Sequence, residues 1–136
     1  MPLWATWNNF TFKDNSKVRT AVFYKDYFNE FVNSQRHRVQ IKILWTIKFV
    51  EHVLIVPSKY FKRIINSDGL YEIRIKTGTN IYRIFCFYNK LNELVILNGF
   101  QKKTEKTPKQ EIIKATLLKY NYEKENEYYN TWRDER

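Results

Sequence analysis

The sequence predicts a single α+β domain in which helices precede and follow a small, largely antiparallel sheet. Apolar residues recur every three or four positions over residues 35–55, as in an amphipathic helix. Residues 70–76, 81–88 and 93–100 are rich in β-branched and aromatic residues, and the turns that join them are too short for a helical crossover. A chain of 136 residues leaves room for one core.

The first part of the chain predicts an extension, a strand and a short helix. Residues 1–17 show no sustained apolar period, so we interpret them as an N-terminal extension and expect the domain itself to span residues 18–122. Residues 18–24 favour a strand. Asp26 is the expected N-cap of a short helix that buries Phe28, Phe31 and Val32.

A long helix is expected over residues 35–55. Its buried stripe consists of Val39, Ile43, Ile47, Val50 and Leu54. The proline at position 57 ends this helix, and residues 58–65 are expected to add one more helical turn before the break at residues 66–69.

The last part of the chain predicts a helix and a tail. Residues 107–110 have the form of a capping box, with Pro108 at the first helical position. The expected helical face is formed by Ile112, Ile113, Thr116, Leu117 and Tyr120. Residues 123–136 mix acids, bases and aromatics without an apolar period, which predicts a solvated charged tail.

The composition predicts a globular protein with a polyanionic partner. Apolar residues make up 43% of the chain, which is enough to form a core. The formal net charge is +10, which favours nucleic acid, an acidic protein or anionic lipid as a partner. One cysteine, no signal-peptide pattern and no run of the roughly 20 apolar residues that span a membrane lead us to expect a cytoplasmic protein with no membrane partner.

The predicted strands place cations on one face of the sheet. Strand alternation puts Arg74 and Lys76 beside Glu72, on the face opposite the apolar residues of that strand. Arg83 lies on an apolar strand, where a charge is costly unless it is paired or exposed at a groove. A structural salt bridge between Arg83 and Glu72 is the alternative explanation.

More cations follow the last predicted strand. Lys102, Lys103 and Lys106 come directly after it. Lys102 and Lys103, together with Arg74, Lys76 and Arg83, would line a concave, positive surface between the sheet and the final helix, suited to the phosphates of a bent single strand. An inert, solvated basic face is the alternative. His37 and His52 lie about four turns apart on the predicted helix, so we expect no metal site, and no cofactor motif is present.

These residues resemble a known toxin family. The segment GLYEIRIKTGTNIYRIFCFYNKLNELVILNGFQKKTEKTPKQEI, residues 69–112, is similar to the HigB-type, phage-derived branch of the RelE/ParE toxin superfamily. The motifs YKDYF and VPSKYFK are also similar, so the resemblance covers roughly residues 18–122. It implies a microbial ribonuclease-like fold, with helices packed on one face of a small, largely antiparallel sheet.

The resemblance also implies an activity and partners. The resemblance to the HigB-type branch implies that the chain is the toxin of a type II toxin–antitoxin module and cleaves mRNA in the A site of the 30S ribosomal subunit. A HigA-like antitoxin with a helix-turn-helix domain silences the toxin, and operator DNA is bound only through that antitoxin. Cleavage is metal-independent and proceeds by attack of a ribose 2′-OH on the adjacent phosphate.

The family's basic positions map onto residues of this chain. The resemblance implies that Arg74, Lys76, Arg83 and Lys102 carry out the chemistry. We assign transition-state stabilisation to Arg83 first and Arg74 second, and the role of general base to Lys76 or Lys102. The remaining RNA-binding candidates are Lys103, Lys106, Phe100 and Tyr71. Two alternatives stay open: a ParE-like toxin that inhibits gyrase without catalysis, and a basic nucleic-acid-binding module.

Overall fold

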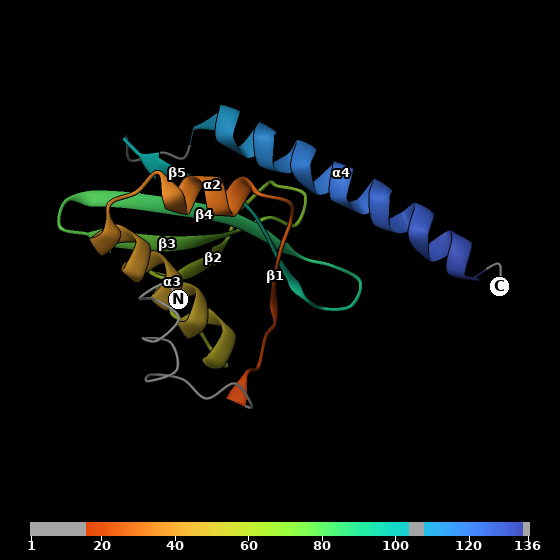
Figure 1. Ribbon diagram of the computed structural model, residues 1–136, viewed down its shortest axis with the longest axis horizontal. Coiled ribbons are helices and arrows are strands. Elements are labelled where there is room, and N and C mark those ends of the chain that lie inside the picture. Colours follow the sequence, from red (N-terminus) through yellow and green to blue (C-terminus); the bar gives the residue numbers. More distant parts are fainter. Residues whose placement is uncertain (1–15, 104–107, 135–136) are drawn as a thin grey trace.

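The computed structural model describes residues 16–103 and 108–134 and contains a five-stranded mixed sheet between helices (Figure 1). The order along the chain is β1 (Ala21–Phe23), α2 (Tyr27–Asn33), α3 (His37–His52), β2 (Phe61–Arg63), β3 (Tyr71–Thr77), β4 (Asn80–Tyr88), β5 (Leu94–Lys102) and α4 (Lys109–Asp134). The strands lie in the order β1-β5-β4-β3-β2. The pair β1–β5 is parallel and the other pairs are antiparallel, so the predicted α+β meander is confirmed.

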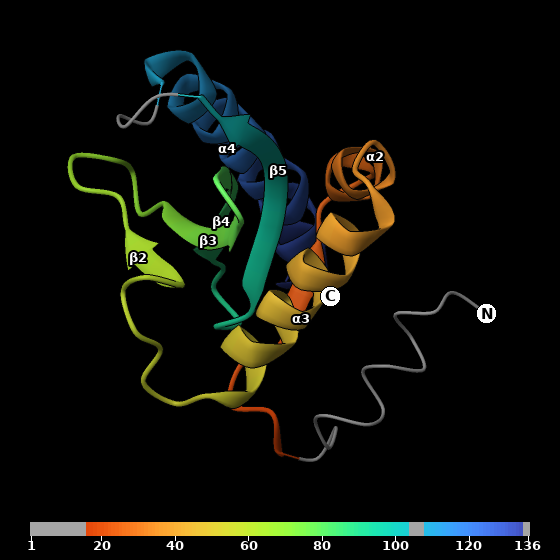
Figure 2. The same ribbon diagram turned by 90° about the vertical axis from the view of Figure 1, so that its left-hand side faces the viewer.

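Helices cover both faces of the sheet (Figure 2). Helices α2 and α3 pack on one face, against residues such as Ile73, Ile84 and Ile96. Helix α4 packs on the other face, against Phe85 and Leu97. Because successive side chains of a strand point to opposite faces, the aromatic and β-branched strands supply apolar residues to two cores at once.

Helix α3 is shorter than the predicted helix over residues 35–55. It ends at His52, and Val53 has extended backbone dihedral angles. The guanidinium of Arg19 donates hydrogen bonds to the carbonyl oxygens of Val50, Val53 and Leu54 at 3.1, 2.6 and 2.8 Å. The bond to Val50 satisfies a carbonyl left open in the last helical turn, and the other two hold the extended chain that follows it, so the helix stops one turn early. Leu54 is 71% exposed rather than part of the buried stripe.

Two further expectations for the first half of the chain are wrong in detail. Residues 58–65 contain strand β2 instead of a helical turn, because Phe61 stacks on Tyr71 of β3 with ring centroids 5.1 Å apart. The first strand is confined to Ala21–Phe23, since the backbone N–H groups of Val18 and Arg19 donate to the carbonyl of Glu51. Asp26 precedes α2 without a side-chain capping bond.

Helix α4 continues through most of the predicted charged tail. The tail prediction for residues 123–136 is wrong for the backbone up to Asp134. Lys119 bonds Glu123 one turn later at 2.8 Å, and the Tyr24 hydroxyl donates to Glu125 at 3.0 Å. A helical ion pair and an anchor to the end of β1 therefore extend the helix past its apolar part.

The buried face of α4 also differs from the predicted one. Ala115 and Leu118 are buried, whereas Ile113, Leu117 and Tyr120 are more than half exposed. The predicted capping box at residues 107–110 includes Thr107, which lies outside the described residues. Within the described ranges, no helix combines the length and apolar character that a membrane span requires.

Gly99 lets β5 pass directly beneath α2. A Cβ at this position would overlap the ring of Phe31, whose Cε1 and Cγ atoms would lie 2.6 and 2.9 Å away. Phe31 is half-buried and packs against the core of the α2–α3 face. The absence of a side chain at position 99 therefore sets how close this helix approaches the sheet.

We predict that Gly99→Ala destabilises the fold by about 1–3 kcal/mol, the usual cost of overpacking a well-packed core. In a Phe31→Leu background the same change should cost clearly less, because the smaller side chain leaves space for the methyl group. Urea unfolding of the four proteins of this cycle measures the coupling. Gly78→Ala is the control: its strain comes from a φ of +59° with no atom within 4 Å, so its cost should be the same in both backgrounds.

Candidate nucleic-acid interface

The register of the sheet brings the four predicted catalytic residues onto one face. Arg74 of β3 pairs with Arg83 of β4, and Lys76 pairs with Ile81, which in turn pairs with Lys102 of β5. Residues that alternate with them, such as Ile73 and Ile84, belong to the core under α2 and α3. The cations therefore lie on the α4 side of the sheet, and we call Arg74, Lys76, Arg83 and Lys102 the basic face.

A buried carboxylate organises the two arginines. Glu72 is 5% exposed; its Oε1 accepts a hydrogen bond from Arg74 Nε at 2.9 Å, and its Oε2 lies 3.6 Å from Arg83 Nε. The alternative salt bridge from the sequence thus exists, but one carboxylate is shared by two guanidinium groups. The cluster keeps a net positive charge before the lysines are counted.

Arg83 is the most buried cation of the basic face, at 8% exposed. Burial lowers the pKa of its guanidinium, the Glu72 carboxylate raises that pKa, and the neighbouring Arg74 lowers it again. An arginine remains protonated at neutral pH despite such a shift. Its Nη1 donates to the Tyr82 carbonyl at 3.3 Å, and Nε has no hydrogen-bond acceptor within the described part of the chain. Arg83 is thus a fixed, partly desolvated positive charge.

The two lysines stand on either side of Ile81. Lys76 is exposed, because β2 pairs only with Tyr71–Ile73 and the rest of β3 forms the edge of the sheet. Lys102 is half-buried and ends β5. With strands about 4.8 Å apart, their backbones lie about 10 Å apart with β4 between them, so a phosphate group above Ile81 would be within reach of both lysine side chains.

The other predicted RNA-binding residues have mixed positions. Phe100 pairs with Arg83 and stacks on Phe85 with ring centroids 5.4 Å apart, so it borders the basic face. Lys103 is exposed directly after β5, and Lys106 lies outside the described residues. Tyr71 lies on the opposite face, stacked on Phe61 and in edge contact with Tyr88. The structure therefore does not bring Tyr71 to the basic face.

The sequence analysis missed one cation of this surface. Lys62 of β2 pairs with Glu72, is exposed, and extends the basic face to the sheet edge. The aromatic residues at positions 60 and 61, directly before Lys62, favour a strand. Because residues 58–65 were interpreted as a helical turn, Lys62 was not assigned to the sheet.

No metal-binding cluster of histidine, cysteine and carboxylate side chains occurs in the described ranges. His37 and His52 stand at the two ends of α3, as their sequence spacing predicted. A cavity of ≈ 540 Å³ lies between the start of α3 and the β3–β4 turn, whereas the sequence placed a concave surface between the sheet and α4.

Comparison with known proteins gives one family match. The model of the family described as phage derived protein Gp49-like (DUF891) matches residues 30–119, well over half of the chain and including the whole basic face. No curated protein matches this chain.

We predict that Glu72→Gln destabilises the fold by about 3 kcal/mol, because removing one partner of a buried ion pair leaves the charge of Arg83 without compensation. Urea unfolding at neutral pH measures the change. Glu93→Gln is the matched control: Glu93 is half-buried and accepts a hydrogen bond from Asn89 at 2.9 Å. Removing the charge from this hydrogen bond should lower the free energy of unfolding by about 1 kcal/mol. Equal costs for the two variants would show that Glu72 does not hold the arginines together.

Proposed function

Since the chain belongs to the phage-derived Gp49-like family, which is toxin-like and of the RelE/HigB type, we propose that it is the toxin of a type II toxin–antitoxin module. In this proposal it is a metal-independent endoribonuclease that cleaves mRNA on the ribosome and so inhibits translation. The observation that carries the proposal is the basic face. In it, Arg74 and Arg83 share the buried carboxylate of Glu72, and Lys76 and Lys102 lie on the same face of the sheet.

The arrangement suits phosphodiester cleavage. The transition state gathers negative charge on the nonbridging phosphate oxygens, and fixed cations in a partly desolvated site stabilise that charge. Arg83 is held by Glu72 and needs no rearrangement when the phosphate arrives. Arg74 is more exposed and provides the second guanidinium. We assign transition-state stabilisation to Arg83 first and to Arg74 second.

The lysines provide the acid–base pair of the proposal. The ribose 2′-OH loses its proton to a general base and attacks the neighbouring phosphorus, while the 5′ oxygen of the next nucleotide leaves and takes up a proton. The products are a 2′,3′-cyclic phosphate and a 5′-hydroxyl. Entering and leaving oxygens lie on opposite sides of the phosphorus, which fits Lys76 and Lys102 on opposite sides of Ile81. Either lysine can be the base.

The proposed setting is the 30S A site. A net charge of +10 attracts the RNA-rich ribosome, and the ribosome would hold the mRNA in a fixed position over the basic face. A HigA-like helix-turn-helix antitoxin would silence the toxin and carry its only contact with operator DNA. Acidic segments of such a partner would complement the basic charge.

We predict that inducing the wild-type chain in cells arrests growth and creates new in-frame mRNA 5′ ends. Arg83→Ala and Lys76→Ala should remove both effects, since losing one transition-state charge costs about 10²–10³-fold in rate. Growth curves and genome-wide mapping of mRNA 5′ ends make the measurement, with antitoxin co-expression as the silencing control. Arg63→Ala is the matched variant, because Arg63 is exposed and pairs with Tyr71, away from the basic face.

The two variants separate folding from chemistry. Arg83 is buried, so its removal also costs stability, whereas Lys76 is exposed and its removal should leave the thermal midpoint unchanged. Arrest without new mRNA ends would contradict the ribonuclease proposal and support gyrase inhibition. Absence of arrest, with salt-dependent RNA binding by the purified chain, would support a binding module.

A further inference from the structure

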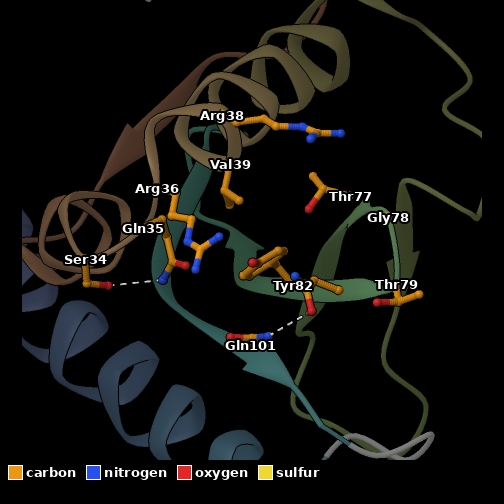
Figure 3. A pocket seen from close by; sticks show the side chains of 11 residues that line it. Ser34, Gln35, Arg36, Arg38, Val39, Thr77, Gly78, Thr79, Tyr82 and Gln101 are labelled. Carbon is orange, nitrogen blue, oxygen red and sulfur yellow. Dashed lines mark hydrogen bonds between the residues drawn. The ribbon is translucent and has the colours of Figure 1, made fainter.

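A surface depression lies on the far side of the sheet from the basic face. Two cavities of ≈ 540 and ≈ 470 Å³ open beside α3 and the β3–β4 turn. Both are lined by Arg38, Thr77 and Gly78, so the two cavities adjoin one another. Figure 3 shows the residues that line the larger one. We call this depression the α3 groove.

The α3 groove is positively charged. Arg36 and Arg38 line the larger cavity, and Arg38 and Lys42 line the smaller one. No acidic residue lines either cavity in the described part of the chain. Neither guanidinium has an ion-pair or side-chain hydrogen-bond partner among the described residues, and both arginines are exposed. In Figure 3 Arg36 points toward Tyr82, and Arg38 extends above Thr77.

Aromatic and amide groups complete the groove. Tyr82, 3% exposed, lies at the base of the larger cavity, where the Gln101 amide donates to the Asn80 side chain at 3.4 Å. Trp45 lines the smaller cavity and stacks on Phe49, with Lys42 Nζ 5.3 Å from the indole ring. Alternation of cations with an aromatic surface is typical of sites that bind single-stranded nucleic acid, because cations contact phosphates and rings stack on bases.

The α3 groove joins the basic face around the edge of the sheet. Lys76 belongs to the basic face and also lines the smaller cavity. This is possible because β2 pairs with β3 only as far as Ile73, so no strand among the described residues pairs with the Lys76 end of β3 on that side. A polyanion on the basic face would therefore meet Lys76 next, and then Arg38 and Arg36.

We propose that the α3 groove is a second nucleic-acid site, which holds the phosphates of a single strand that leaves the basic face past Lys76. The choice of RNA as the strand rests on the proposed function, whereas the groove itself requires only a single-stranded phosphodiester. Its continuity with the basic face and the indole of Trp45 favour a nucleic acid over an acidic peptide.

The test is fluorescence anisotropy with oligonucleotides that cannot be cleaved. The probes are 5′-labelled 2′-deoxy oligomers of about 4 and about 12 nucleotides. Because each such site holds only a few nucleotides, the longer oligomer can contact both surfaces at once. In the double variant Arg36→Gln/Arg38→Gln, binding of the longer oligomer should weaken about 10-fold. The slope of log binding constant against log salt concentration should become less steep by about 1.4. This corresponds to the loss of two phosphate contacts at about 0.7 each for a single strand. Binding of the shorter oligomer should not change.

The matched control is Arg63→Gln/Lys90→Gln, which removes two exposed charges outside both surfaces and should leave the binding of both oligomers unchanged. Equal weakening in the two double variants, or no weakening in either, would overturn the proposal. A crosslinking experiment on the wild type needs no variant: 4-thio-2′-deoxyuridine near one end of the longer oligomer should crosslink to a peptide of α3. Crosslinks confined to β3, β4 and β5 would also overturn the proposal.

These outcomes are separate from those of the proposed function. If mRNA cleavage in cells is absent while anisotropy still depends on Arg36 and Arg38, the ribonuclease proposal fails and the second site stands. If cleavage occurs and anisotropy does not depend on these arginines, the ribonuclease proposal stands and the second site fails.

Discussion

The carboxylate of Glu72 is the interaction on which the arrangement of the basic face depends. It is buried in β3 and contacts Arg74 on its own strand and Arg83 on the next. Without it, two guanidinium groups on adjacent strands would repel each other, and Arg83 would be a buried charge with no counterion. With it, both arginines keep fixed positions while the surface keeps its excess positive charge. The stability of this part of the sheet and the positive charge of the basic face therefore rest on the same three side chains.

Strand alternation explains why so much of this site could be predicted from the sequence. Arg83 stands out because it interrupts an apolar strand, and the period of two assigns Arg74 and Lys76 to the same face before any pairing is known. The meander follows from turns that are too short for a crossover. Whether Arg83 pairs with Glu72 or faces a groove could not be decided from the pattern, since the structure combines ion pairing with a positive surface.

Long-range contacts account for what the sequence did not predict. The end of α3 depends on the Arg19 guanidinium, and β2 forms because Phe61 stacks on Tyr71 of β3. Neither contact produces a periodic pattern of apolar residues in the local sequence. The same holds for the α3 groove, which is formed by residues at the start of α3 and residues around the β3–β4 turn. It becomes visible when the β3–β4 turn and α3 are placed side by side.

The contact between the two ends of the domain has a consequence for synthesis. The Tyr24 hydroxyl donates to Glu125, 101 residues later, and the parallel pairing of β1 needs β5. Contacts so distant along the chain cannot form while the later partner is still inside the ribosome that makes it. The complete fold therefore assembles only after its last helix has emerged. A cell that makes this chain has an interval after the first helices appear in which a binding partner can meet an incomplete, unassembled sheet.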